Sequence, residues 1–137
     1  KLAQTVVDFQ ADLVVSAGFL KILGPRFLAA FPNRVVNTHN SLLPAFPGIH
    51  GPRDALRTGV KLAGATLFVV DPGMDTGPIL AQVAVEVREE DTEATLTERI
   101  KTAERAQLVQ SIEKMVQGGW WVEANKAGFE SHPEQLR

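Results

Sequence analysis

The sequence predicts an α/β fold with an open, mainly parallel sheet that ends in an antiparallel pair and carries helices on both faces. Two strand-like runs predict the parallel part: residues 12–17, a continuous apolar run typical of a strand buried on both faces, and residues 34–39. A short helix predicted over 25–31 separates them, as in a parallel crossover unit. Two further β-rich runs, 62–70 and 79–87, are joined by turn residues that favour antiparallel pairing.

Proline and glycine set the boundaries in the first half of the chain. The apolar spacing over 2–9 fits the end of a helix. Segment 40–51 holds two prolines and two glycines, which is too much punctuation for regular structure. The sequence then predicts a short helix over 52–58 that ends at Gly59.

The last third of the chain predicts one long helix and little else. Asp91 can cap a helix over 92–116, which the Gly118-Gly119 pair ends. Residues 120–123 fit a short final strand, and residues 126–137 are predicted to form a polar tail.

Composition favours a single soluble domain over residues 1–137 and excludes several kinds of function. The chain is 45% hydrophobic, which lets a domain of this length bury a core without disulfides. It has no cysteine, which excludes disulfides, thiol catalysis and cysteine-ligated metals and fits a reducing compartment. The net charge of −2, without a basic stripe, argues against nucleic acid or an acidic membrane as partner. The longest apolar run, 12–23, contains Lys21 and is too short to span a membrane.

The candidate catalytic residues lie where the second predicted strand ends, since ligands of open α/β sheets bind outside the carboxyl ends of parallel strands. Asn37 and His39 are two residues apart, so their side chains point to the same face. An amide donor beside an imidazole that can carry a proton suits a developing oxyanion. The pair alone is equally compatible with residues that merely begin a loop. The apolar content of 41–48, however, favours a loop that forms the wall of a pocket.

Two carboxylates have alternative interpretations. Asp75 lies in an Asp-Thr-Gly triplet, which forms turns readily and also presents the catalytic group of aspartic proteases. That protease chemistry needs two such aspartates, and the chain has one such triplet in an α/β pattern. Glu104 follows Leu96 and Ile100 at helical i, i+4 steps, on a stripe expected to face the core. Because a buried unpaired carboxylate is unfavourable, Glu104 is expected at the rim, in an ion pair or against a ligand.

Four motifs in this order resemble the formyltransferases that use 10-formyltetrahydrofolate, which have a Rossmann-like fold. The motifs are Ala17-Gly-Phe-Leu-Lys-Ile-Leu23, Asn37-Thr-His39, Ser41-Leu-Leu-Pro44 and Asp75-Thr-Gly-Pro78. The likeness runs from about residue 12 to residue 116. Within the family, segments 46–56 and 102–104 are similar to the branch that formylates glycinamide ribonucleotide in purine synthesis.

The resemblance implies a set of site residues and ligands. Asn37, His39 and Asp75 match the catalytic residues of the family, and Gly18 and Glu104 match positions near the ribonucleotide. The positions that match the folate site are Leu20, Lys21, Ile22, Leu23, Asn37, Asp71, Gly73 and Asp75. The resemblance implies 10-formyltetrahydrofolate as the formyl donor, no metal and a cytoplasmic enzyme of small molecules, and it is compatible with a homodimer.

The sequence departs from the family pattern in three places. Asn40 stands where this branch usually has proline, and Phe68 stands where relatives often have another histidine, so Phe68 is assigned no role. The family also begins with a strand and a loop that binds the substrate phosphate, and the chain is expected to lack this N-terminal half. Two alternatives therefore stay open. One is an enzyme with another acceptor (water, methionyl-tRNA or a sugar-nucleotide amine); the other is a non-catalytic folate-binding fragment.

Overall fold

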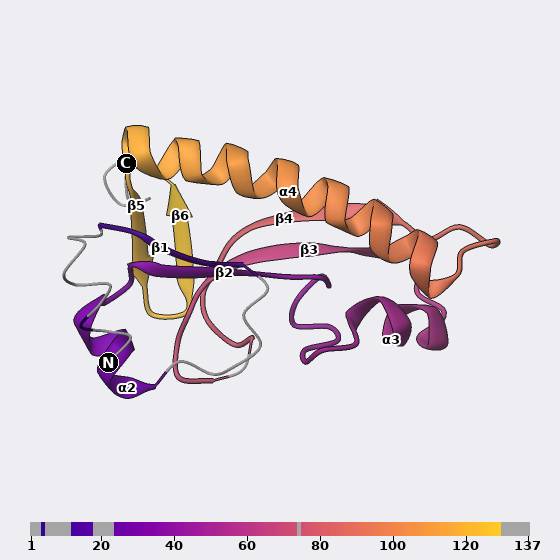
Figure 1. The fold of residues 1–137 in the computed structure, drawn as a ribbon, viewed down its shortest axis with the longest axis horizontal. Helices are drawn as coiled ribbons and strands as arrows, with labels where there is room; N and C mark the ends of the chain where they lie inside the picture. The colour runs from indigo at the N-terminus through magenta and orange to yellow at the C-terminus, as the bar shows by residue number, and fades with distance from the viewer. Residues whose placement is uncertain (1–3, 5–11, 18–23, 74, 130–137) are drawn as a thin grey trace.

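One mixed sheet organises the part of the chain that the computed structural model describes, which is residues 4, 12–17, 24–73 and 75–129 (Figure 1). Its strands lie in the order β1-β2-β3-β4-β6-β5. Their bounds are Val14–Ala17 (β1), Val35–His39 (β2), Leu62–Val69 (β3), Ile79–Glu86 (β4), Trp120–Glu123 (β5) and Lys126–Phe129 (β6). The helices are Pro25–Ala30 (α2), Gly51–Thr58 (α3) and Glu93–Gly118 (α4).

The predicted α/β sheet is confirmed, but it is mixed rather than mainly parallel over the described strands. β1 pairs with β2 in parallel, as the crossover pattern predicts, and β3 pairs with β4 antiparallel. β4 and β6 are also parallel, whereas β2–β3 and β5–β6 are antiparallel. The short connection between β5 and β6 requires antiparallel pairing, since parallel pairing needs a much longer crossover. The antiparallel pairing of β2 with β3, across a long connection, is the other departure from the predicted sheet.

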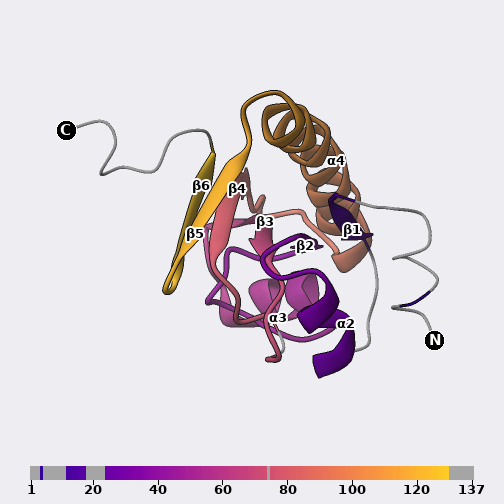
Figure 2. The same cartoon turned by 90° about the vertical axis from the view of Figure 1, so that its left-hand side faces the viewer.

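Helices cover both faces of the sheet, as predicted (Figure 2). α4 lies along one face, where Leu96 and Ile100 are fully buried against the small side chains Ala63 and Ala65 of β3. On the opposite face, Val35 of β2 packs against Phe27 of α2 and against Phe31, the C-cap of that helix. Small residues beneath α4 let the helix axis approach the sheet closely, which buries the apolar stripe of the helix. No described helix is long and apolar enough to cross a membrane.

The prediction of a polar tail over 126–137 is wrong for residues 126–129, which form β6. β6 pairs with β5 as a hairpin, and Ala124 in the connecting turn has a φ of 53°. Gly128 lies against the ring of Trp121, because a Cβ built at Gly128 would come within 2.8 Å of that ring. β6 has only four residues, Lys-Ala-Gly-Phe. In so short a segment the alternation of apolar residues with lysine and glycine is too weak to predict a strand. Residues 130–137 lie outside the described part.

Thr92, rather than the predicted Asp91, is the N-cap of α4. The Thr92 hydroxyl accepts a hydrogen bond from the backbone N–H of Thr95 (3.2 Å), and the Thr95 hydroxyl accepts one from the N–H of Thr92 (3.0 Å). This reciprocal capping box satisfies two backbone donors at the helix start. The α3 end at Gly59 is confirmed, with a left-handed φ of 80°.

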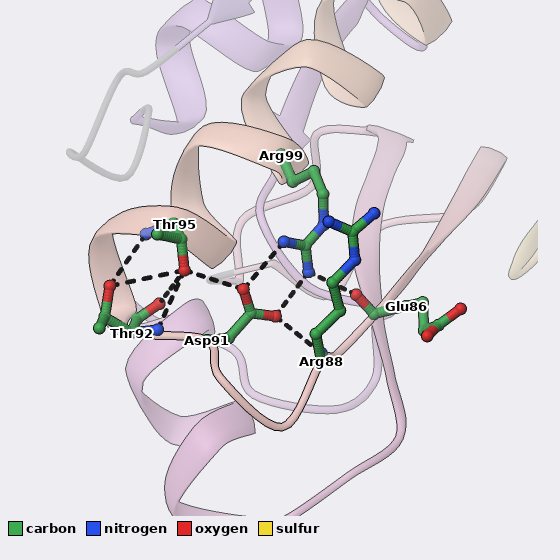
Figure 3. Close-up of polar contacts among 6 residues, drawn as sticks. All are labelled: Glu86, Arg88, Asp91, Thr92, Thr95 and Arg99. Carbon is green, nitrogen blue, oxygen red and sulfur yellow. Dashed lines mark hydrogen bonds and ion pairs between the residues drawn. The ribbon is translucent and has the colours of Figure 1, made fainter.

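Asp91 instead accepts the guanidinium of Arg99 (Figure 3). Its two oxygens lie 2.8 and 2.5 Å from the two terminal nitrogens of Arg99, and the backbone N–H of Arg88 donates at 2.7 Å. Arg99 also donates to the carbonyl of Glu86, so the cluster ties the first turns of α4 to the end of β4. The Asp91 side chain is only 2% exposed. Bidentate geometry of this kind is the strong form of an arginine–carboxylate pair.

We predict that Asp91→Asn lowers the midpoint of thermal unfolding near neutral pH. The Arg99 guanidinium and the Arg88 N–H hold the pKa of Asp91 well below its ordinary value of 3.8. A depressed carboxyl pKa contributes stability above the unfolded value, and that contribution is lost as the pH falls toward the folded value. The difference between variant and wild type should therefore be constant above pH 5 and shrink below 3.8.

Glu89→Gln is the matched control, because Glu89 is an exposed carboxylate in the same loop. Calorimetry of the three proteins across this pH range measures the effect. A difference between Asp91→Asn and wild type that did not depend on pH would contradict an electrostatic role for Asp91.

Candidate active site

Asn37 and His39 lie in the second half of β2, and each is paired with a residue of β3. Asn37 is opposite Phe68 and His39 is opposite Thr66. The side-chain carbonyl of Asn37 accepts the backbone N–H of Thr38 at 2.8 Å. This bond turns the two amide hydrogens of Asn37 away from the strand, and no acceptor among the described residues takes them. Asn37 is therefore arranged to donate.

His39 is buried, with 7% of its side chain exposed, and both ring nitrogens face oxygen atoms. Nε2 lies 2.8 Å from the carbonyl oxygen of Phe46, and Nδ1 lies 3.6 Å from Oδ2 of Asp75. Because a carbonyl oxygen only accepts, Nε2 must carry a hydrogen. A second hydrogen, present on the imidazolium, would sit on Nδ1 and face the carboxylate of Asp75. The separation of 3.6 Å exceeds a hydrogen bond, so Nδ1 keeps the capacity to donate elsewhere.

Asp75 is fixed by its own loop and by the loop after β2. Its Oδ2 accepts the backbone N–H of Gly48 at 2.9 Å. Asp75 and Phe46 both have left-handed backbones, with φ of 55° and 50°. Such conformations at residues other than glycine persist only where the surroundings enforce them, and they gather at functional sites. The two residues that face the ring of His39 are thus both held in unusual conformations.

The segment before Asp75 is organised by Asp71. Oδ1 of Asp71 accepts the N–H of Gly73 at 2.9 Å and the hydroxyl of Thr76 at 2.7 Å. Gly77 follows at a point of close approach, where a Cβ would lie 1.6 Å from the carbonyl oxygen of Val69. Asp71 and Gly73, expected near the folate, therefore shape the turn that presents Asp75.

The prediction that 41–48 forms the wall of a pocket is confirmed. A cavity of about 670 Å³ lies between this loop, the Asp75 turn and the β5–β6 hairpin. Its lining residues are Leu43, Pro44, Pro47, Asp75, Thr76, Gly77, Ile79, Trp121, Asn125, Lys126 and Ala127. Asp75 thus borders both His39 and this mostly apolar cavity.

Glu104 is half-buried at the margin of α4, and no described residue pairs with it. The buried residues of the second half of the helix are Gln107, Ser111 and Met115, so the buried stripe passes beside Glu104. Steps of four residues drift by about 40° around a helix of 3.6 residues per turn, which moves Glu104 off the line of Leu96 and Ile100. Glu104 was expected at the rim, in an ion pair or against a ligand, and the structure places it at the rim.

Gly18, Leu20, Lys21, Ile22 and Leu23 lie outside the described residues. Among those described, no group of histidine and carboxylate side chains is arranged to hold a metal. The sequence did not identify the carbonyl of Phe46 or the N–H of Gly48 as site atoms, because backbone groups carry no residue-type signal. Their only trace is the Phe-Pro-Gly turn pattern.

Comparison with known proteins places this geometry in a family. The model of the formyl transferase family matches residues 1–112. Phosphoribosylglycinamide formyltransferase of Mycobacterium tuberculosis is 57% identical over 110 residues, which cover 80% of this chain and 51% of that protein. Formyltetrahydrofolate deformylase of Escherichia coli O6:H1 is 33% identical over 126 residues, 92% of this chain and 45% of that protein.

Among solved structures, glycinamide ribonucleotide transformylase 1 of Symbiobacterium toebii superposes with a TM-score of 0.90 at 40% identity. The superposition covers 95% of this chain and 61% of that protein. The chain spans about half the length of the curated relatives it matches. By sequence and by fold, the chain belongs to the formyl transferase family.

Proposed function

We propose that this chain carries the catalytic residues of a cytoplasmic enzyme that transfers a formyl group from 10-formyltetrahydrofolate to glycinamide ribonucleotide in purine synthesis. Residues 1–137 would form one catalytic unit. The identity to a phosphoribosylglycinamide formyltransferase, 57% over 110 residues, supports the choice of acceptor. The observation that carries the proposal is the arrangement of His39, which is buried between a carbonyl and a carboxylate with a free amide donor two residues away.

The chemistry follows from the donors at the end of β2. The amine of the ribonucleotide attacks the formyl carbon and gives a tetrahedral intermediate with a negatively charged oxygen. The amide of Asn37 and Nδ1–H of His39 would donate to that oxygen, since Nε2 is already committed to Phe46. Donors fixed before the reaction stabilise such an oxyanion without reorganising.

Asp75 would act on both the histidine and the proton balance. Its carboxylate faces Nδ1 and so stabilises the imidazolium form that the oxyanion requires. The attacking amine must lose a proton and N10 of the folate must gain one when the C–N bond breaks. Asp75 borders an open cavity, so it is placed to relay that proton through water. This sequence of steps uses no metal.

The binding positions complete the proposal. Asp71 and Gly73 would present their turn to the pterin of the folate, together with Leu20, Lys21, Ile22 and Leu23. Gly18 and Glu104 would contact the ribonucleotide. Glu104 has a carboxylate without a described partner at a helix margin, which fits a hydroxyl-bearing ligand such as a ribose.

We expect His39→Gln to lower kcat for formyl transfer by about 10²–10³-fold, the usual loss on removing one oxyanion donor. Glutamine retains a donor for the Phe46 carbonyl but cannot carry the positive charge. Formyl transfer is measured with the protein as its gene encodes it, and folate binding is measured by calorimetry. We expect folate binding to persist. Activity within about tenfold of the wild type would remove His39 from the mechanism.

Asp75→Asn should lower kcat and change the ring ¹⁵N shift of Nδ1 of His39, the nitrogen that the carboxylate faces. Asparagine tolerates the left-handed backbone and can still accept from Gly48, so only the charge facing Nδ1 is lost. The ring ¹⁵N shifts of His39 report the electrostatic environment of each ring nitrogen. Asp54→Asn, on α3, is the control and should leave those shifts unchanged. If Asp75→Asn also leaves them unchanged, Asp75 is a turn former only.

For Glu104, we predict that Glu104→Leu preserves thermal stability while weakening glycinamide ribonucleotide binding more than folate binding. Leucine adds to the neighbouring apolar stripe, and no described ion pair is lost. The two ligands are titrated separately. Unchanged affinity for both ligands would make Glu104 a rim residue, and a joint fall in both affinities with lower stability would make it structural.

Formyl release from 10-formyltetrahydrofolate without any amine would point instead to water as the acceptor.

A further inference from the structure

A network of hydrogen bonds connects the sheet to the loop after His39, on the face opposite α4. The hydroxyl of Thr66, which is fully buried, donates to the carbonyl of Ser41 at 2.7 Å and accepts the N–H of Leu43 at 3.0 Å. Gln82, on the neighbouring strand β4, is opposite Thr66 in the register. Its amide nitrogen donates to the Thr66 hydroxyl at 3.0 Å and to the carbonyl of Leu43 at 2.9 Å.

This network uses its groups to capacity. A hydroxyl has one hydrogen and two lone pairs, and those of Thr66 are all engaged. Both amide hydrogens of Gln82 are likewise engaged, one by Leu43 and one by Thr66. Gln82 itself is exposed. Its side chain lies between the solvent and two polar atoms, the hydroxyl oxygen of Thr66 and the carbonyl oxygen of Leu43, and supplies a donor to each.

The loop that Gln82 holds carries the acceptor of His39. Leu43 is three residues from Phe46, whose carbonyl takes the Nε2 hydrogen of His39. The hydroxyl of Ser41, at the start of this loop, donates to the carbonyl of Ala45, the residue before Phe46, at 2.5 Å. A displacement at Leu43 therefore reaches Phe46 through a short, internally bonded segment.

We propose that Gln82 is a positioning residue, which orients the imidazole of His39 by clamping the 41–46 loop to β3. The role in turnover rests on the proposed function, whereas the effect on the His39 ring does not. Gln82 lies on a strand that contributes none of the proposed catalytic groups. Its amide reaches the site through Leu43 and Thr66, which hold the loop that carries the carbonyl of Phe46. A misplacement of about 1 Å in a reacting group can cost up to 10²-fold in rate.

The test is Gln82→Met, which keeps the length of the side chain and removes both donors. We expect kcat to fall by about tenfold with KM for the folate little changed. The Nε2–H proton of His39 should also exchange faster with solvent in ¹H–¹⁵N spectra, because its acceptor is no longer fixed. The chain has three histidines, which makes the ring signals assignable.

Gln110→Met is the matched control: the same substitution at an exposed glutamine of α4, far from the loop in sequence. It should alter neither kcat nor the His39 signal. Thr66→Ser and Thr66→Val provide a second route, since serine keeps the hydroxyl that Gln82 bonds and valine removes it. Valine should reproduce the His39 change and serine should not.

The proposal is overturned if Gln82→Met leaves the exchange of the His39 proton unchanged, or if Gln110→Met changes it equally. A changed His39 signal with kcat within about twofold of wild type would also overturn the positioning role. If the wild-type protein transfers no formyl group at all, the proposed function fails, and the exchange measurement still decides whether Gln82 orients His39.

Discussion

The antiparallel register of β2 on β3 sets the geometry of the whole site. It places His39 opposite Thr66 and Asn37 opposite Phe68, so the two candidate donors share a face with the buried hydroxyl. That hydroxyl anchors the loop that follows His39. A shift of the register by one residue would turn both donors toward α4 and leave the loop without its anchor. The packing of β2 opposes this shift, since Val36 is fully buried with Leu67 of β3 and Met115 of α4 on the other face of the strand.

The site combines rigid backbone with buried polar groups, and each depends on the other. Phe46 and Asp75 are held in left-handed conformations that single residues adopt reluctantly. The bonds that enforce them include Gly48 N–H to Asp75 and the imidazole to the Phe46 carbonyl. A histidine buried between a carbonyl and a carboxylate is costly unless both nitrogens are used. The bond to Phe46 therefore satisfies Nε2 and fixes the ring, while Nδ1 faces the carboxylate of Asp75 at 3.6 Å.

Local patterns in the sequence specify the elements and the chemical groups. Apolar runs located β1 to β4, and the Gly59 stop located the end of α3, because hydrophobic periodicity and turn chemistry are local properties. The ordered motifs around Asn37 and Asp75 determined the family. β6 was not predicted, because its four residues, Lys-Ala-Gly-Phe, form a strand only by pairing with β5. The role of Asp91 has no local signal for a related reason, because its partner Arg99 lies two turns into the helix.

The tertiary structure determines which atoms act together. It brought Asp75 within 3.6 Å of Nδ1 of His39 across 36 positions of sequence, and it chose Nε2 as the nitrogen bound to Phe46. It also placed Glu104 at the rim, one of the three positions expected for it, because steps of four residues drift around the helix. Gln82 had no local signal, since its role depends on strand pairing. The sequence specifies the type of each residue, but the distance between residues of separate segments is set only when their strands pair in the sheet.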